Sequence, residues 1–299
     1  AVRTAITKAK RGGFKDTQSE YLLSAVLSGV CKRAKLPPSM VDDICVGNVL
    51  APGGGAVISR MAMFHAGFPD KTTVYTLNRQ CSSGLQAVAN IAAALRTDSI
   101  KIGIGAGVES MTLHYGPGAV PSNISDAVLS VKQASDCLIP MGITSENVAK
   151  EFGISRSVQD EFSAGSHKKA ASAQEQSLFE EIIPVILPDG TKIDKDDGIR
   201  KETSVQLLSK LKPSFVEDGT TTAGNSSQVS DGAAAVLLMK RKTARTLSLP
   251  ILGTFVDFVV VGVAPHIMGI GPAVAIPELL KKNNLKVSDI DIFEINEAF

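Results

Sequence analysis

Residues 27–50, LSGVCKRAKLPPSMVDDICVGNVL, align without a gap with residues 276–299, IPELLKKNNLKVSDIDIFEINEAF, at an offset of 249 positions. Both stretches, called here the first and second copy, run from an apolar helix through a basic pair to a β-branched strand. Two homologous α/β halves separated by an insertion would produce this pattern. A chance likeness of two helix–turn–strand units is the alternative. The identical pairs are Lys32/Lys281, Leu36/Leu285, Ser39/Ser288 and Asp42/Asp291.

The middle of the chain differs in character from the two copies. Residues 113–242 are polar and turn-rich, which is typical of an insertion layered on a first domain. We therefore expect a first half at 1–112, a loop domain at 113–242 and the start of a second half at 243–299.

The two copies also differ in how much sequence follows them. The first copy continues through a strand, a cysteine, a helix and a further strand ending near Val108, whereas the second copy reaches only Phe299. If the chain is complete, the second half lacks roughly sixty residues. It would then expose apolar surface and an unpaired sheet edge, which favours poor solubility.

Composition argues against several classes of protein. Lys and Arg number 31 against 30 Asp and Glu, so no basic excess points to nucleic acid or an anionic membrane surface. No apolar run approaches the roughly 20 residues that a membrane span needs. The four cysteines have no Cys-x-x-Cys spacing, which argues against a metal site or a disulfide framework and favours a reducing compartment.

Cys81 lies in TLNRQCSSGLQAVANIAAAL (76–95), between a β-branched run and a helix-like run. A thiol at a strand-to-helix junction lies near free helix N–H groups and the positive end of the helix dipole, which stabilise a thiolate. The same N–H groups can bind the oxyanion of an acyl group on the sulfur. The alternative is a thiol that merely fills core space. Of the remaining cysteines, Cys31 and Cys45 are expected to be core thiols. The sequence does not decide the role of Cys137.

The elements around Cys81 are expected to be buried. The run TVYTL (73–77) reads as a strand buried on both faces, and the helix after Cys81 is apolar nearly all round. Alternating glycines in IKIGIGAGVESM (100–111) lack the Gly-x-Gly-x-x-Gly pattern of dinucleotide sites and favour close packing of another backbone. These glycines are Gly103, Gly105 and Gly107.

Six motifs, spread essentially from end to end, together resemble thiolases, specifically the degradative 3-ketoacyl-CoA thiolases of peroxisomes. The resemblance implies the thiolase fold: two similar five-stranded α/β halves in a layered α-β-α-β-α core, with a loop domain between them. That implication agrees with the repeat. The motifs are NRQCSSGLQAV (78–88), GVESM (107–111), MGITSENVA (141–149), TTTAGNSSQVSDGAAA (220–235), IMGIGPA (267–273) and INEAF (295–299).

The resemblance implies thiolytic cleavage of a 3-ketoacyl-CoA in fatty-acid β-oxidation. Cys81 matches the nucleophile that attacks the 3-keto carbon, after which acetyl-CoA leaves and free CoA takes the acyl group from sulfur. A soft, easily ionised thiol attacks a carbonyl well and leaves well. Asn296 matches the asparagine that holds a water, and this water and a catalytic histidine together stabilise the acetyl-CoA enolate.

In thiolases the loop domain holds the adenine and pantetheine of CoA, which is a substrate, so no cofactor or metal is implied. An arginine near adenine, an apolar wall along pantetheine and a serine on its amide suit this long ligand. The resemblance also implies a homodimer and a peroxisomal location. The matching positions are Met141, Arg200, Phe215, Ala223 and Ser227.

Two family motifs are absent: the GHP loop with the catalytic histidine and the CxGxG loop with a second cysteine. A nucleophile without its partners loses several orders of magnitude in rate, so we expect negligible thiolysis from these 299 residues alone. The alternatives are a non-catalytic protein that binds CoA or only assembles, and a biosynthetic acetoacetyl-CoA thiolase. The histidines outside the motif are His65, His114, His266 and His167, of which the last reads as solvated.

Overall fold

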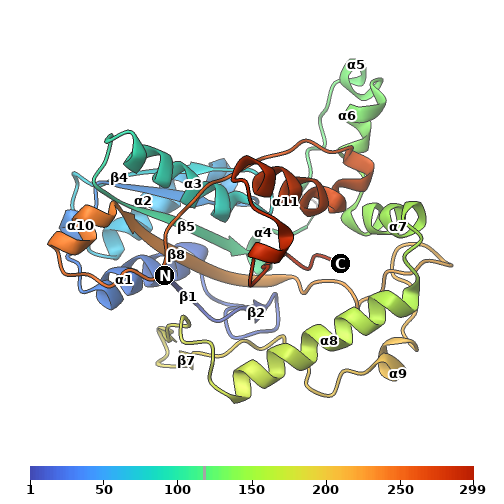
Figure 1. Cartoon of the computed structure of the whole chain (residues 1–299). Coiled ribbons are helices and arrows are strands. Elements are labelled where there is room, and N and C mark those ends of the chain that lie inside the picture. Colours follow the sequence, from blue (N-terminus) through green and yellow to red (C-terminus); the bar gives the residue numbers. More distant parts are fainter. Residues whose placement is uncertain (117–118) are drawn as a thin grey trace. The chain divides into compact units, whose positions relative to one another are not determined.

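The structure is a computed structural model that describes residues 1–116 and 119–299 and divides into two compact units (Figure 1). Unit 1 contains the main sheet, and unit 2 is mostly helices and loops. Unit 1 comprises Ala1–Ala119, Phe179–Gly198 and Val229–Val256, and unit 2 comprises Val120–Leu178, Ile199–Gln228 and Asp257–Phe299.

One mixed sheet forms the centre of unit 1, with strand order β1-β8-β5-β3-β4. β3 lies between β4 and β5 and is parallel to both, while β8 is antiparallel to β5. The expected five strands become six in the described chain because the N-terminal segment pairs with β8 twice, as β1 and as β2. The strands are β1 (Val2–Arg3), β2 (Thr7–Lys8), β3 (Asp43–Gly47), β4 (Thr73–Leu77), β5 (Ile102–Ser110) and β8 (Ser230–Met239).

Helices cover both faces of this sheet. Alternate residues of a strand point to opposite faces, so Ile44 and Val46 pack in the core with α1 and α2, while Cys45 packs with α3. The other elements of unit 1 are short. The bounds are α1 (Ser19–Ala34), η1 (Pro38–Met40), η2 (Pro52–Gly55), α2 (Ala56–His65), α3 (Ser83–Arg96), α4 (Met111–His114), β6 (Val185–Ile186), β7 (Lys192–Ile193) and α10 (Arg241–Thr246).

The expected burial of the elements around Cys81 is partly wrong. β4 is the edge strand, so its side chains are only half covered and Tyr75 is 39% exposed. α3 buries one side against the sheet and leaves Leu85 60% exposed. Cys31 and Cys45 are buried, which confirms them as core thiols.

The expected loop domain at 113–242 does not coincide with unit 2, and two of its segments belong to unit 1. Residues 230–239 form β8, which pairs with β5 along its whole length and so belongs to the main sheet. Residues 179–198 also belong to unit 1 and carry β6 and β7. Both segments contain apolar residues that join the core of unit 1, such as Val185 and Ala235.

Unit 2 carries the second copy. Its helix α11 and the turn η5 lie where the alignment predicts them, but residues 290–299 form no strand, and neither do residues 249–264. Neither segment pairs with a strand of the described chain, and a lone strand leaves its backbone N–H and C=O groups unpaired. No helix in the described ranges has the length and apolar character needed to cross a bilayer. The elements are α5 (Asp126–Leu129), α6 (Lys132–Asp136), α7 (Met141–Glu151), α8 (Arg156–Glu175), α9 (Val205–Leu208), η4 (Pro265–Ile270), α11 (Gly271–Lys282) and η5 (Val287–Asp289).

Candidate active site

Cys81 lies in the turn between β4, which ends at Leu77, and α3, which begins at Ser83. The structure therefore confirms the predicted strand-to-helix junction. The side chain is exposed, unlike those of the two core cysteines. Gln80, immediately before it, has a φ of 50°, in the left-handed region that side chains rarely adopt. A non-glycine residue in this region marks a backbone that its surroundings hold in place.

Side chains of the turn itself hold this backbone. Ser83 Oγ accepts from the N–H of Arg79 at 2.8 Å and donates to the C=O of Gln80 at 2.6 Å. The N–H of Gln80 donates to Asn78 Oδ1 at 2.8 Å, and Ser82 Oγ donates to the C=O of Arg79 at 2.9 Å. The serines beside Cys81 therefore shape the turn in addition to leaving the approach to sulfur open.

Asn78 and the half-buried Glu109 both bind the loop at Val49 and Leu50. Asn78 Nδ2 donates to the C=O of Val49 at 3.1 Å, and Glu109 accepts from the N–H groups of Val49 and Leu50 at 2.8 and 3.3 Å. Burial raises the pKa of Glu109, although these two amides oppose the shift. Glu109 lies inside the GVESM motif, but its role could not be predicted from the sequence because its partners are distant in the chain.

Two glycines let α3 rest directly on the sheet backbone. A Cβ on Gly47 would lie 2.4 Å from the carbonyl carbon of Ser83, and a Cβ on Gly105 would lie 2.7 Å from the Cα of Val88. Real Cβ atoms essentially never approach so closely. The predicted close packing of another backbone on the alternating glycines is confirmed at Gly105.

The first turn of α3 offers hydrogen-bond donors beside Cys81. Within residues 1–116 and 119–299, the backbone N–H groups of Gly84 and Leu85 have no acceptor. α3 has 14 residues, and its N-cap Ser82 makes no capping bond to these amides. Free amides at the positive end of a helix stabilise a thiolate or an oxyanion. The turn can therefore support nucleophilic chemistry at sulfur.

In unit 2, an apolar wall gathers around Phe215. Its ring lies against the backbone of Gly142, where a Cβ would be 2.3 Å from three ring atoms. The rings of Phe215 and Phe299 meet edge to face, with centroids 6.3 Å apart. Met141, which begins α7, is 38% exposed and Phe215 is 43% exposed. This wall leaves apolar side chains open to a ligand.

The residues after Asn296 form hydrogen bonds with Ser227, an expected CoA contact, and with Ser166. The N–H of Ser227 donates to the C=O of Ala298 at 2.9 Å, and Ser166 Oγ donates to Glu297 at 2.5 Å. Asn296 itself is exposed, and in the described chain its side chain has no hydrogen bond. Unit 2 thus gathers several predicted residues around the end of the INEAF motif.

His167, expected to be solvated, is half-buried and has a backbone partner. Its Nδ1 accepts from the N–H of Arg200 at 3.2 Å, so the ring is neutral at that nitrogen. Burial lowers the pKa of His167, the charge of Arg200 lowers it further, and Glu297 opposes the shift. The side chain of Arg200 remains exposed.

The loop that carries Ala223 and Ser227 is fixed by polar residues that sequence analysis missed. Glu146 accepts from the N–H groups of Thr220 and Thr221, and Asn225 donates to the buried Asp160 at 3.0 Å. Partial burial alone would raise the pKa of Glu146, but these hydrogen bonds lower it. No cluster of three or more potential metal ligands exists among the residues that the structure describes.

Two family models together match nearly the whole chain. The family model of the thiolase N-terminal domain matches residues 1–242, and that of the thiolase C-terminal domain matches residues 249–299. The human peroxisomal 3-ketoacyl-CoA thiolase is 56% identical over 306 residues, covering 99% of this chain and 72% of the human protein. The Arabidopsis thaliana peroxisomal 3-ketoacyl-CoA thiolase 2 is 55% identical, covering 100% and 67%.

Solved structures agree with the sequence matches. The dimeric peroxisomal thiolase of Saccharomyces cerevisiae superposes with a TM-score of 0.95 at 48% identity, covering 100% of this chain and 78% of the yeast chain. A second structure of the yeast peroxisomal enzyme, described as five-layered and built from two core domains of identical topology, gives 0.81 at 42% identity, covering 100% and 75%. The chain has the thiolase fold and belongs to the thiolase family.

Proposed function

We propose that the protein cleaves 3-ketoacyl-CoA thiolytically, with Cys81 as the nucleophile. The observation that carries the proposal is the exposed thiol in a fixed turn beside the unused amides of Gly84 and Leu85. The peroxisomal 3-ketoacyl-CoA thiolases that this chain resembles support the substrate class. The alternatives, a non-catalytic CoA-binding protein and a biosynthetic acetoacetyl-CoA thiolase, are not favoured by these relatives.

The reaction proceeds in two half-reactions. The Cys81 thiolate adds to the 3-keto carbon, and the bond between carbons 2 and 3 breaks, leaving the acyl group on sulfur and the electron pair on the enolate of acetyl-CoA. Protonation of the enolate at carbon 2 releases acetyl-CoA. The thiolate of free CoA then adds to the acyl carbon, and the Cys81 thiolate leaves.

The unused amides at the start of α3 would stabilise negative charge as it develops on the acyl oxygen. Asn296, through a bound water, would stabilise the enolate oxygen. Its exposed, unpartnered side chain in unit 2 is compatible with that role.

CoA, as a substrate, would bind along unit 2. Arg200 would face the adenine end, and Ser227 would contact the pantetheine amides. Met141, Phe215 and Ala223 would form the apolar wall, which their exposed side chains support.

Acylation by acetyl-CoA tests the nucleophile. Intact mass measurement should show one acyl group on the wild type and on Cys137→Ala, and none on Cys81→Ala. Cys137→Ala is the matched control because Cys137 is the other exposed cysteine. An adduct of equal size that persists in Cys81→Ala would refute the role of Cys81.

Titration with CoA tests the binding site separately. Arg200→Ala and Ser227→Ala should each weaken binding while the unfolding temperature stays unchanged. Arg245→Ala, which removes an exposed arginine from α10 in unit 1, should bind CoA like the wild type. Unchanged affinity in both unit 2 variants would contradict the assigned contacts.

We also propose a homodimer located in peroxisomes. The dimeric yeast structure and the relatives named as peroxisomal support this assembly and this location. Within unit 1, β4 is an edge strand, and an unpaired edge is a natural surface for association. Light scattering should give twice the chain mass, and the protein should sediment with peroxisomal markers. A monomer in scattering would contradict the first claim, and a cytosolic fraction the second.

A further inference from the structure

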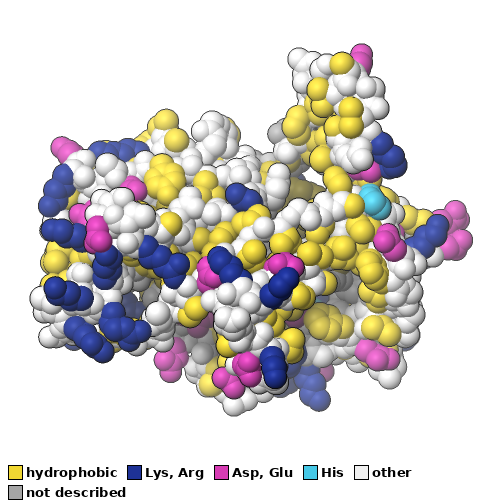
Figure 2. All heavy atoms as spheres, turned by 45° about the horizontal axis from the view of Figure 1, so that its top comes forward, with side chains coloured by type: hydrophobic (Ala, Val, Ile, Leu, Met, Phe, Trp, Pro, Cys, Tyr) yellow, Lys and Arg dark blue, Asp and Glu magenta, His cyan; other side chains and the backbone are white. Residues whose placement is uncertain are grey.

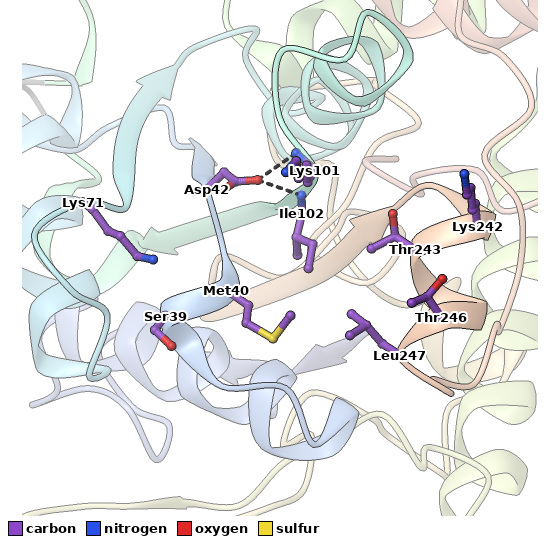
Figure 3. A pocket seen from close by; sticks show the side chains of 10 residues that line it. All are labelled: Ser39, Met40, Asp42, Lys71, Lys101, Ile102, Lys242, Thr243, Thr246 and Leu247. Atoms are coloured by element: carbon purple, nitrogen blue, oxygen red, sulfur yellow. Dashed lines mark hydrogen bonds between the residues drawn. The ribbon is translucent and has the colours of Figure 1, made fainter.

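A cavity in unit 1 lies where β3 and β5 begin, away from the turn of Cys81 at the other end of β4. Its volume is about 440 Å³, within the range of small-molecule sites. Figure 3 shows its lining side chains, which come from the η1 turn, the starts of the strands and α10. The proposed chemistry at Cys81 uses none of these residues.

Three lysines line the cavity from three separate elements (Figure 3). Lys71 precedes β4, Lys101 precedes β5, and Lys242 lies on α10. None of the three ammonium groups forms an ion pair with any residue that the structure describes. Like charges held around one cavity repel each other, and a bound anion would relieve that repulsion.

The single carboxylate in the lining is already engaged. Asp42 Oδ2 accepts from the N–H of Lys101 at 2.7 Å and from the N–H of Ile102 at 3.0 Å. These bonds hold the carboxylate against the backbone at the start of β5 (Figure 3). The cavity therefore keeps an excess of positive charge.

Hydroxyl groups and an apolar floor complete the lining. The side chains of Ser39, Thr243 and Thr246 make no hydrogen bond with the described residues, so their hydroxyls are available to a ligand. Ile102 is buried and Met40 is half-exposed, which gives the floor an apolar character. Lysine ammonium groups and hydroxyls bind phosphate oxygens well.

Basic residues also surround the cavity. Figure 2 shows Lys and Arg side chains gathered at the left of the view, the end of unit 1 that carries α10 in Figure 1. Arg241 and Arg245 lie on the same short helix as Lys242. The nearby Asp98 is paired with Lys240. This field would draw an anion towards the cavity.

We propose that this cavity binds a small phosphorylated molecule that carries at least two closely spaced negative charges. The lysines would contact the phosphate oxygens, the free hydroxyls would donate to them, and the apolar floor would accept the rest of the molecule. All lining residues belong to unit 1, whereas the proposed CoA contacts belong to unit 2. The cavity and the proposed CoA contacts therefore have no residue in common.

Isothermal titration of the full chain with inorganic pyrophosphate tests the proposal. The wild type should bind saturably, and binding should weaken as salt is raised because the charges are exposed. The double variant Lys71→Gln/Lys101→Gln should bind at least tenfold more weakly, and orthophosphate should bind the wild type at least tenfold more weakly than pyrophosphate does. Acylation of Cys81 should be unchanged in the double variant.

Two controls separate this site from general charge and from the CoA contacts. Lys32→Gln removes an exposed lysine of unit 1 that does not line the cavity, and Arg200→Ala removes the proposed adenine contact. Both should bind pyrophosphate like the wild type. The proposal is overturned if the wild type shows no saturable binding, if orthophosphate binds equally well, or if either control weakens binding as much as the double variant.

Discussion

The first and second copies fold alike from the end of their helix to the following turn and then diverge. In the first copy, the N–H of Leu36 donates to the C=O of Cys31 at 3.0 Å; in the second, the N–H of Leu285 donates to the C=O of Leu280 at 2.9 Å. Both pairs are related by the offset of the alignment. The agreement in hydrogen bonding supports duplication over chance likeness.

The agreement extends to the backbone at the helix ends. Lys35 and Asn284 occupy aligned positions and have left-handed φ angles of 53° and 55°. A 3₁₀ turn follows each of them, η1 in the first copy and η5 in the second. A left-handed residue commonly ends a helix because it lets the last carbonyls find partners.

The copies separate at the strand. β3 is flanked by β4 and β5, whereas residues 292–296 are exposed and pair with no strand of the described chain. A helix satisfies its own backbone, but a strand depends on neighbours. The local sequence therefore determines the helix and its turn, while tertiary contacts determine the strand.

The largest test of this contrast replaces aligned strand residues. Ile44→Ala, at a fully buried position, should lower the free energy of unfolding by about 2–5 kcal/mol. Phe293→Ala, at the aligned position that is 42% exposed, should cost less than half as much. Urea unfolding followed by circular dichroism measures both. Equal losses would mean that the second copy packs this segment as tightly as the first.

A second test substitutes the aligned residues Gly47 and Asn296. Gly47→Ala places a Cβ against Ser83 and should cost about 1–3 kcal/mol. It should also slow acylation of Cys81 at least about tenfold, because small displacements of a reacting group are costly. Asn296→Gly, at an exposed position, should change unfolding by less than about 0.5 kcal/mol. A stable, normally acylated Gly47→Ala would disprove the backbone contact.

A third test uses pH and the aligned pair Cys31 and Leu280. Burial raises the pKa of Cys31 from 9.0 to about 11, so the folded state keeps the thiol protonated while the unfolded chain ionises. The stability from this thiol is complete below about pH 9 and is lost as pH rises towards 11.

Cys31→Leu introduces the residue that the second copy has at the aligned position. The free energy of unfolding should then fall less between pH 8 and pH 10, by on the order of 1 kcal/mol. The buried Cys45, whose pKa is also raised to about 11, is present in both proteins. Its contribution to the pH dependence therefore cancels in the comparison. Parallel pH profiles for the two proteins would contradict the assigned burial of the Cys31 thiol.

The smallest expected effect concerns the left-handed residues. Lys35→Gly should stabilise the protein by about 0.5–1 kcal/mol, because glycine adopts this conformation without strain. Asn284→Gly should gain less, since asparagine tolerates the region better than lysine does. Thermal unfolding resolves the order. A larger gain at Asn284 would indicate that the two helix ends differ in strain.

The sequence was sufficient to predict structural features that depend on residues close together in the chain. The strand before Cys81, the helix after it and the close approach at Gly105 follow from local patterns, and all three are present. The helix and turn of the second copy were predicted equally well.

Contacts between residues far apart in the chain could not be predicted from the sequence. Glu109 supports Val49 across 60 positions, and Glu146 holds Thr220 across 74. Neither partner changes the local pattern of apolar and polar residues, so no periodicity reveals the pair. β8 was assigned to the insertion for the same reason: only its pairing with β5 places it in the main sheet.

The contact of α3 with Gly47 and Gly105 has a consequence for how the protein tolerates change. Side chains in a core can repack around a substitution, but two backbones in direct contact have no atoms left to rearrange. The height of Cys81 above the sheet is therefore set by main-chain thickness. Substitutions elsewhere in the core can therefore accumulate while the thiol keeps its position. The mutations that can displace it are those that add a side chain at these two glycines.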